Sequence, residues 1–325
     1  MTLILTHSEI SGLLDRADVH KAVEMAFAGL ATGECLNPAP HALRLPSEGT
    51  AIPMEAASGD RVSVKLLCDL PANRQHGRPT QRSTIMVTSA VTGECVAILD
   101  GRAITAIRTA AASAVATDHL ATRSARVLGL IGAGNLAIQH AHAIAAVRDI
   151  TEIVVWSRND ATVQNFRAAT EGLGVTVTQA RSPEVVVAAA DIVCTLTPSR
   201  DPILQGDWLR AGQHVNAVGA PPRPDHREVD AAGMRRARLV VDSHPTVMAK
   251  SGAVLLAIAE GAITAEDAST ELGAVIAGLA AGRTADDQIT LFESVGIGLQ
   301  DLVTARLVIA RAHEHGIGTD IDLTR

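Results

Sequence analysis

Short apolar runs separated by amphipathic stretches alternate along the middle of the 325-residue chain. Six of these runs have the length and composition of buried strands, at 127–131, 153–156, 175–177, 192–196, 214–218 and 239–241. Helical spacing of apolar residues follows the first three runs, at 135–147, 159–172 and 182–190. Short apolar strands that alternate with helices are typical of an α/β fold with a doubly wound parallel sheet of the Rossmann type.

The two ends of the chain show another pattern. Apolar spacing predicts helices over 6–33 (with Ser8 or Asp18 as caps), 103–120, 266–280 and 295–315. Residues 35–100 are rich in short β-like runs, with candidate strands at 62–67, 83–88 and 95–99. Thr92-Gly93 reads as the hairpin turn between the last two strands. The sequence therefore predicts a second α/β unit with an antiparallel or mixed sheet.

Composition and charge exclude several classes of function. Hydrophobic residues make up 47% of the chain and aromatic residues 2%, so the core is expected to be aliphatic. The formal charge of −7, without a basic cluster, argues against nucleic acid as a partner. No membrane is expected, because no run has the roughly 18 apolar residues of a spanning helix. No signal peptide is expected, and the four widely spaced cysteines include no CxxC pair, which favours a cytoplasmic protein. No metal site is expected, because paired ligand spacings are missing and His140 and His142 would point in different directions on a helix.

The strongest motif is a glycine turn directly after the strand at 127–131. Gly132, Gly134 and Ala137 form a G-x-G-x-x-A pattern at the start of a helix. Gly132 permits the tight turn, Gly134 lets a pyrophosphate approach the backbone, and Ala137 lets the helix pack on the strand. Asn135 and Leu136, which open the helix, are expected to contact the cofactor with them. The motif predicts a nicotinamide dinucleotide site.

The end of the second strand indicates which dinucleotide is preferred. A carboxylate there would bind the ribose 2′-OH of NAD(H), but the run reads Ser157-Arg158-Asn159, with no acid before Asp160. Ser157 can donate to a 2′-phosphate and Arg158 can neutralise it, so NADP(H) is favoured and NAD(H) stays possible. Alternatively, Arg158 is a solvated loop residue that stacks on the adenine. Further contacts are expected on the nicotinamide side, from Thr195, Thr197 and Val218 at the ends of the fourth and fifth strands.

Four separate motifs resemble the ornithine cyclodeaminase/mu-crystallin family. They are SVKLLCDLPANR, VTGECVAILDGRAITAIRTAAASAVAT, GLIGAGNLA and ITLFESVGIGLQDLVTARL, and the resemblance runs from about Arg44 to Ile317. It implies a substrate-binding and dimerisation domain over 1–110 with 300–325, a Rossmann domain over 111–299, and a homodimer. It also implies a small amino- or imino-acid substrate.

By the same resemblance, basic residues of the first domain hold the substrate carboxylate. The matching positions are Arg44, Lys65 and Arg108, and ordinary salt bridges are the alternative for each. Lys65 lies within an apolar strand, where an unpaired ammonium would be costly, so it is expected to face a cleft. Met54 matches a substrate-pocket position, although core packing explains it equally well, and Thr109 is a candidate cofactor contact.

One departure from the family's cyclodeaminases decides the predicted reaction. Those members carry an aspartate shortly after the Val-Gly-Ala of the fifth strand, where this chain has Pro221. The segment instead resembles the RPDxRE variant of ketimine reductases, and Asp225 is expected to cap the following helix. The sequence thus predicts an NAD(P)H-dependent reductase of cyclic imino acids, which converts Δ1-pyrroline-2-carboxylate or Δ1-piperideine-2-carboxylate to L-proline or L-pipecolate. Lys65, placed between two arginines with a lowered pKa, is the expected catalytic residue that handles the imine proton.

Three alternatives to that reaction stay open. They are an ornithine or lysine cyclodeaminase, an alanine dehydrogenase, and a non-catalytic NADP-dependent binding protein of the mu-crystallin type. Asp301, in GLQDLV, is expected either to contact the cofactor or to be a carboxylate on the surface of a helix.

Overall fold

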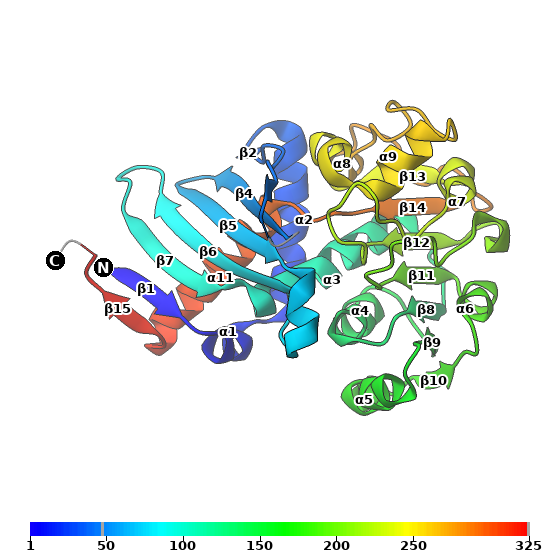
Figure 1. Cartoon of the computed structure of the whole chain (residues 1–325), viewed down its shortest axis with the longest axis horizontal. Helices are drawn as coiled ribbons and strands as arrows, with labels where there is room; N and C mark the ends of the chain where they lie inside the picture. The colour runs from blue at the N-terminus through cyan, green and yellow to red at the C-terminus, as the bar shows by residue number, and fades with distance from the viewer. Residues whose placement is uncertain (47–48, 324–325) are drawn as a thin grey trace. The chain divides into compact units, whose positions relative to one another are not determined.

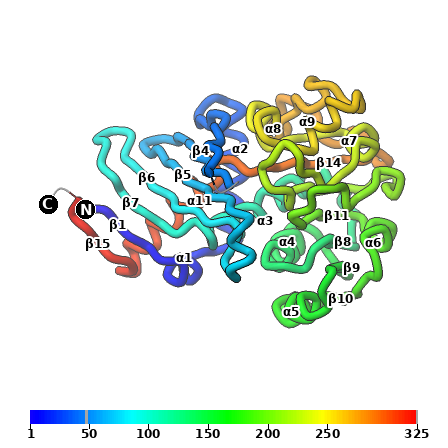
Figure 2. Tube along the Cα trace, viewed as in Figure 1, coloured from blue at the N-terminus to red at the C-terminus, as the bar shows by residue number. Residues whose placement is uncertain are grey.

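The computed structural model describes residues 1–46 and 49–323 and divides the chain into two compact units. The first unit comprises Met1–Arg108 and Ile297–Arg325, and the second comprises Thr109–Gly296. Both have a sheet with helices packed on it, as the ribbon and the Cα trace show (Figures 1 and 2). The chain is therefore an α/β protein, as predicted.

The second unit is built on a parallel sheet. Its strand order is β10-β9-β8-β11-β12-β14-β13, and every described pair is parallel. The bounds are β8 Val127–Ile131, β9 Glu152–Trp156, β10 Thr176–Gln179, β11 Ile192–Thr195, β12 His214–Ala217, β13 Arg238–Val241 and β14 Thr290–Glu293. The six predicted strands are confirmed, and β14 is an addition that the pattern did not predict. The order reverses between β8 and β11, which is the usual ligand position in a doubly wound sheet.

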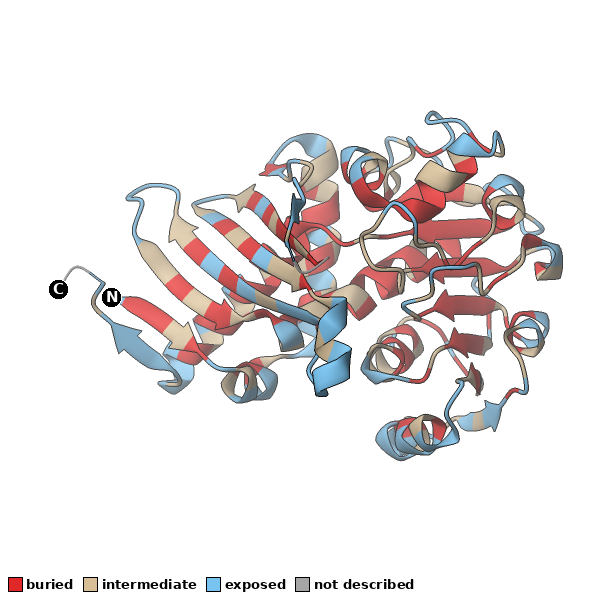
Figure 3. Cartoon of the chain, in the orientation of Figure 1, coloured by how far each residue is buried: buried red, intermediate tan, exposed pale blue. Residues whose placement is uncertain are grey.

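Helices cover both faces of this sheet, because its strands are apolar on both sides. They are α4 Asn135–Ala145, α5 Asp160–Thr170, α6 Pro183–Ala189, α7 Ala231–Arg236, α8 His244–Lys250, α9 Gly252–Ala259 and α10 Leu272–Ile276, with short 3₁₀ turns at Glu171–Leu173 and Gly206–Trp208. One buried cluster joins alternate strand residues to α4 and α5, and a second joins the others to α6, α7, α8 and α9. Figure 3 shows the central strands β8, β11, β12 and β14 buried along most of their length, whereas the edge strand β10 is mostly exposed. Of the predicted helix over 266–280, only α10 is helical, because residues 266–271 are not helical and Gly278 takes a left-handed φ of 72° after its end.

The first unit contains a mixed sheet, as predicted. Its order is β15-β1-β7-β6-β5-β4-β2, with β3 paired to β4, and β1–β7 is the parallel pair. The bounds are β1 Thr2–Leu5, β2 Cys35–Leu36, β3 Leu43–Arg44, β4 Thr50–Ser58, β5 Arg61–Asp69, β6 Gln81–Ser89, β7 Cys95–Asp100 and β15 Thr319–Ile321, and a 3₁₀ helix spans Pro71–His76. The hairpin turn at Thr92-Gly93 is confirmed, since β6 and β7 are antiparallel and Gly93 has φ 76°.

The helices of the first unit are α1 His7–Leu13, α2 Arg16–Thr32 and α11 Gly298–His315, and α3 Gly101–Leu120 begins in it. The predicted caps were wrong. Thr6 forms a capping box with Glu9, and the Asp15 side chain accepts from the backbone of α2, because the helical stretch over 6–33 is interrupted at 14–15. Burial alternates along the strands of this sheet, so one face is covered and the other more open (Figure 3).

Among the described residues, no helix is both long and apolar enough to cross a membrane. All four cysteines are free thiols, with Cys35 and Cys194 buried and the other two half-buried.

Candidate functional site

The glycine turn lies between β8 and α4, in the setting that the motif requires. Gly132 has φ 113°, which favours glycine, and an added Cβ would lie 2.8 Å from the Leu196 carbonyl oxygen. Gly134 caps α4, and a Cβ there would meet no atom within 4 Å. Ala137 is fully buried against the sheet. Open backbone at a helix N-terminus fits a pyrophosphate, since its N–H groups and the helix dipole favour an anion.

The two residues that open α4 differ in exposure. Asn135 is exposed, whereas Leu136 is half-buried and packs against the apolar cluster beneath the helix. The Asn135 side chain and both backbone N–H groups therefore lie at the helix end that the glycine turn leaves open.

The loop after β9 presents the predicted pair of donors. Arg158 is exposed and Ser157 half-buried. Asn159 caps α5 through the backbone of Ala161, and the Asp160 carboxylate accepts from Gln179 Nε2 at 2.8 Å. The nearest acid is thus engaged with β10, and the end of β9 presents a hydroxyl and a guanidinium.

The ends of β11 and β12 meet on a buried glutamate that sequence reasoning missed. Glu228 accepts hydrogen bonds from the backbone N–H of Thr197 at 2.6 Å, the Thr197 hydroxyl at 2.7 Å and the backbone N–H of Gly219 at 2.8 Å. Burial raises the pKa of Glu228 to about 7, against the effect of these hydrogen bonds. Thr195 is fully buried and Val218, whose N–H donates to Thr195 O, is half-buried.

Other polar groups buried in this unit have structural partners. His140 lies between Leu136 O and the Ser113 hydroxyl, and His214 contacts the Thr290 hydroxyl and Asn216. Burial lowers the pKa of His140 to about 4 and that of His214 to about 3. Glu293 accepts from the Ser251 hydroxyl, and burial raises its pKa to about 8.

No described group of histidines, cysteines and acids has the arrangement of a metal site. His142 contacts Ala169 O on another side of α4, so the two histidines of this helix do point apart.

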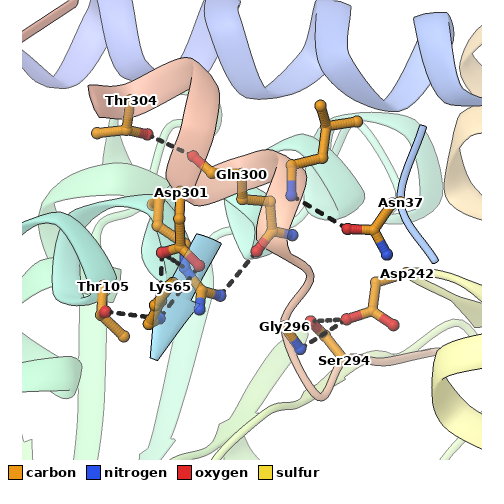
Figure 4. Close-up of polar contacts among 11 residues, drawn as sticks. Asn37, Lys65, Thr105, Asp242, Ser294, Gly296, Gln300, Asp301 and Thr304 are labelled. Atoms are coloured by element: carbon orange, nitrogen blue, oxygen red, sulfur yellow. Dashed lines mark hydrogen bonds and ion pairs between the residues drawn. The ribbon is translucent and has the colours of Figure 1, made fainter. Parts of the chain in front are cut away.

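In the first unit, Lys65 and Arg108, two of the three predicted carboxylate-binding residues, come together on Asp301. Figure 4 shows Lys65 and Asp301 side by side. Lys65 Nζ lies 3.1 Å from both carboxylate oxygens of Asp301, and Arg108 Nε lies 3.0 Å from Asp301 Oδ1. Lys65 also donates to the Thr105 hydroxyl, and Arg108 donates to Gln300 Oε1 at 2.7 Å. Because Oε1 accepts from Arg108, the Gln300 Nε2 group is a donor, and it has no hydrogen-bond partner among the described residues.

The fold explains how these side chains meet. Lys65 points from β5 toward the buried face of its sheet, Arg108 lies on α3, and Gln300 and Asp301 lie in the first turn of α11. Gly298 allows α11 to begin against β4, since a Cβ there would lie 2.8 Å from Glu55 O. The cluster is almost fully buried, with side-chain exposures of 1% for Lys65 and 0% for Asp301.

The remaining predicted residues of this region lie outside the cluster. Arg44 is exposed on the short strand β3. Met54 is buried on β4 and is the register partner of Lys65. Thr109 follows Arg108 on α3 and is half-buried.

Three expectations about charged residues need correction. Asp301 is buried in the cluster, so it is not a helix-surface carboxylate. Lys65 is paired with this acid, whereas the sequence had suggested a lysine between two arginines. Asp225 does not cap the following helix, because it contacts His226 and Arg200, and Asp230 caps α7.

The parallel sheet with its glycine turn defines a Rossmann-type α/β protein with a second, mixed-sheet unit. The chain belongs to the ornithine cyclodeaminase/mu-crystallin family, whose sequence pattern matches residues 1–316. Alanine dehydrogenase from Archaeoglobus fulgidus is 32% identical over 324 residues, covering 100% of this chain and 99% of that protein. Δ1-Pyrroline-2-carboxylate reductase from Bacillus cereus is also 32% identical, over 325 residues that cover 98% and 99% of the two chains.

Two solved structures share the whole fold. Δ1-Pyrroline-2-carboxylate reductase from Thermococcus litoralis, in complex with NADH and L-proline, has a TM-score of 0.94 at 33% identity, covering 98% of this chain and 100% of that one. An archaeal alanine dehydrogenase dimer with bound NAD also has a TM-score of 0.94, at 31% identity and 99% coverage of both chains. The similar proteins thus include enzymes of two kinds, alanine dehydrogenases and Δ1-pyrroline-2-carboxylate reductases.

Proposed function

We propose that this protein is an NAD(P)H-dependent reductase of cyclic imino acids that forms L-proline or L-pipecolate. The observation that carries the proposal is the buried cluster in which Lys65 and Arg108 converge beside the Gln300 amide. Ammonium, guanidinium and amide N–H groups are the donors that a substrate carboxylate requires. Arg44, exposed on β3, is proposed as a further contact to that carboxylate, and Met54 as an apolar neighbour of the ring.

The chain's residues supply binding, orientation and a proton in this reaction. When bound, the nicotinamide supplies hydride to the imine carbon. Lys65 holds a proton for the imine nitrogen, and Asp301 fixes the ammonium in place through two contacts of 3.1 Å. Replacing Lys65 by Met is expected to lower kcat more than it raises KM, which separates a proton-handling role from simple binding. Unchanged kcat and KM would exclude that role.

The loop after β12 favours reduction over cyclodeamination. Pro221 stands where the family's cyclodeaminases carry an acid, and a proline side chain cannot transfer a proton. The acid nearest in sequence, Asp225, is engaged with His226 and Arg200. Reduction of a preformed C=N bond needs no such acid at this position.

Both dinucleotides fit the proposal, and NADP(H) is the preferred one. Gly132, Gly134, Asn135 and Leu136 would hold the pyrophosphate, because they form the open helix end described above. Ser157 and Arg158 would bind a 2′-phosphate, because the end of β9 carries no acid beside them that would repel it. The nearest acid, Asp160, is engaged with Gln179. The solved relatives contain NADH and NAD, so the proposed preference for NADP(H) rests on Ser157 and Arg158 of this chain alone. Thr109, Thr195, Thr197 and Val218 are proposed to line the nicotinamide side.

The test is oxidation of NADPH, and separately of NADH, by the purified protein with three substrates. These are Δ1-pyrroline-2-carboxylate, Δ1-piperideine-2-carboxylate, and pyruvate with ammonia. Fast oxidation with a cyclic imine supports the proposal. Turnover confined to pyruvate and ammonia would show an alanine dehydrogenase, the second candidate, which the relative from Archaeoglobus fulgidus supports. Inactivity with all three would call for cyclodeaminase assays with ornithine and lysine. Inactivity there as well would favour a non-catalytic binding protein.

A further inference from the structure

Glu228 lies in the segment between β12 and α7, and its carboxylate contacts both the start of that segment, at Gly219, and the loop after β11, at Thr197. We infer that Glu228 is a positioning residue for the nicotinamide half of the dinucleotide site. The inference rests on the dinucleotide binding proposed above, and it assigns a role to a residue that does not itself need to touch the cofactor.

The carboxylate joins the ends of two adjacent strands. Oε1 accepts from the backbone N–H and the hydroxyl of Thr197, which follows β11, and Oε2 accepts from the N–H of Gly219, which follows β12. The distances of 2.6 to 2.8 Å are those of charge-assisted hydrogen bonds. Glu228 is 2% exposed, so little water competes for these donors.

Backbone packing extends this contact to the glycine turn. A Cβ on Gly219 would lie 2.3 Å from the Thr197 nitrogen, and a Cβ on Gly132 would lie 2.8 Å from the Leu196 carbonyl oxygen. The loops after β8, β11 and β12 are therefore in direct backbone contact. A change in the position of Thr197 or Gly219 would therefore displace the backbone of the neighbouring loops.

The strand order indicates which half of a bound dinucleotide would lie near the loops that Glu228 contacts. In a doubly wound sheet, the adenosine lies over the half that contains the glycine turn and the next strand, here β8 and β9. The other nucleotide lies beyond the switch point, over the ends of β11 and β12. Glu228 holds those two strand ends and has no described hydrogen bond to the loop after β9.

A role in packing alone would not require a carboxylate. Placing an acid in the interior is costly, as the raised pKa of Glu228 indicates, and an apolar side chain of similar size would fill the volume without that cost. The carboxylate instead accepts hydrogen bonds from the Thr197 N–H, the Thr197 hydroxyl and the Gly219 N–H. Its function is thus to fix the positions of the loops.

The experiment compares NADH with ADP-ribose, which lacks the nicotinamide. NADH binding is followed by its fluorescence, and ADP-ribose binding by displacement of NADH. In Glu228→Gln, Oε1 can keep the Thr197 bonds while the new amide N–H group faces the Gly219 N–H. We expect the Kd for NADH to rise about tenfold, as for a buried donor left unpaired, and that for ADP-ribose to change less than about twofold.

Two further variants make the test decisive. Glu293→Gln removes another buried carboxylate, which contacts Ser251 and has no described hydrogen bond to Thr197 or Gly219, and it is expected to bind both ligands as the wild type does. Thr197→Val removes the hydroxyl bond alone and is expected to raise the Kd for NADH about threefold, roughly half of the free-energy effect of Glu228→Gln. If Glu228→Gln does not fold, Glu228→Asp takes its place, and it is expected to weaken NADH binding more than ADP-ribose binding, because the shorter side chain draws the carboxylate away from Thr197 and Gly219.

Unchanged NADH binding in Glu228→Gln, or equal weakening of both ligands, would overturn the inference, and so would unchanged binding in Thr197→Val. Wild-type protein that binds neither NADH nor ADP-ribose would instead contradict the proposed dinucleotide binding, and the inference would fall with it.

Discussion

Arg108 is held on two sides within its own unit. Its Nε donates to Asp301 and one terminal nitrogen donates to Gln300 Oε1. A guanidinium carries five N–H donors in one plane, so these two bonds fix the direction in which the others point. A fixed planar group can bind a carboxylate through two hydrogen bonds, whereas a lysine ammonium in its place would act as a point charge.

Arg108→Lys should therefore weaken substrate binding. Loss of hydrogen bonds to a charged group costs about 1.5–3 kcal/mol, so the KM for the imino acid should rise roughly 10- to 100-fold, with a smaller effect on kcat. Steady-state kinetics measure both. Arg102→Lys, exposed on the same helix, is the matched control and should behave as the wild type. A large fall in kcat at constant KM would speak against carboxylate binding by Arg108.

At the residue scale, the sequence singled out Lys65 and Arg108 but not the acid that pairs with both, and Arg44 lies outside their cluster. Lys65 was recognisable as a charge inside an apolar strand. Asp301 lies 236 residues further along the chain, and no local spacing connects the two. Glu228 is bound largely by backbone N–H groups, which any sequence supplies. Its one local signal is an acid directly before the buried Val229, and that signal does not say what the acid contacts.

The glycine turn gives a prediction at the scale of a structural element. Gly134→Ala should fold with an unchanged Tm, because a Cβ there meets nothing within 4 Å and the φ of −77° suits alanine. The added methyl group should nevertheless weaken the binding of NADH and NADPH about tenfold or more, since it occupies the side from which the pyrophosphate approaches. Titration of both dinucleotides measures the effect.

Gly172→Ala, which also has open space, is the control for the substitution itself. Undiminished dinucleotide affinity in Gly134→Ala would mean that the phosphates do not bind at this turn.

Element by element, periodicity predicted what recurs and missed what does not. The strands from β8 to β13 were predictable because each is an apolar run within a regular alternation. β14 was missed because the irregular stretch 277–289 separates it from α10, so it does not directly follow a helix as the other strands of the pattern do. β4 contains Pro53, and a proline argues against a strand when only the sequence is known.

For the whole molecule, burial links stability to pH. The pKa of Glu228 rises from 4.5 to about 7 and that of Glu293 from 4.5 to about 8, whereas those of His140 and His214 fall from 6.5 to about 4 and about 3. An acid whose pKa is raised by folding contributes stability that is lost as pH rises from its unfolded pKa through its folded pKa. A histidine whose pKa is lowered by folding contributes stability that is lost as pH falls below 6.5 toward its folded pKa. The two effects oppose each other between pH 4.5 and 6.5, and above 6.5 the glutamates prevail.

The free energy of unfolding should accordingly decrease between about pH 6.5 and pH 8, by on the order of 2–3 kcal/mol. Urea denaturation across this range measures it. Glu293→Gln should show a smaller decrease, because it removes the group that titrates highest. A stability that stays constant or increases toward pH 8 would mean that these carboxylates are ionised at no cost in the folded protein.

The first unit also gives a prediction about assembly. On the sheet face opposite α11, Val62, Leu66 and Met86 are 37%, 44% and 41% exposed, and their strands β5 and β6 are neighbours. The similar archaeal alanine dehydrogenase is a dimer. Light scattering should give about twice the chain mass of 33.8 kDa, and Leu66→Lys should shift it toward one chain.

Val91→Lys, at the exposed hairpin tip, is the control and should leave the mass unchanged. A wild-type protein with the mass of a single chain would exclude the dimer.

The central claim is that buried cations in the first unit bind the carboxylate of a cyclic imine that is then reduced. The most direct measurement compares NADPH oxidation with Δ1-piperideine-2-carboxylate and with Δ1-piperideine, the same ring without its carboxylate. A site built to bind that group should favour the first by at least about a thousandfold in kcat/KM. Comparable turnover of the two rings would contradict carboxylate binding by Lys65 and Arg108, and turnover of neither would contradict the proposed reduction.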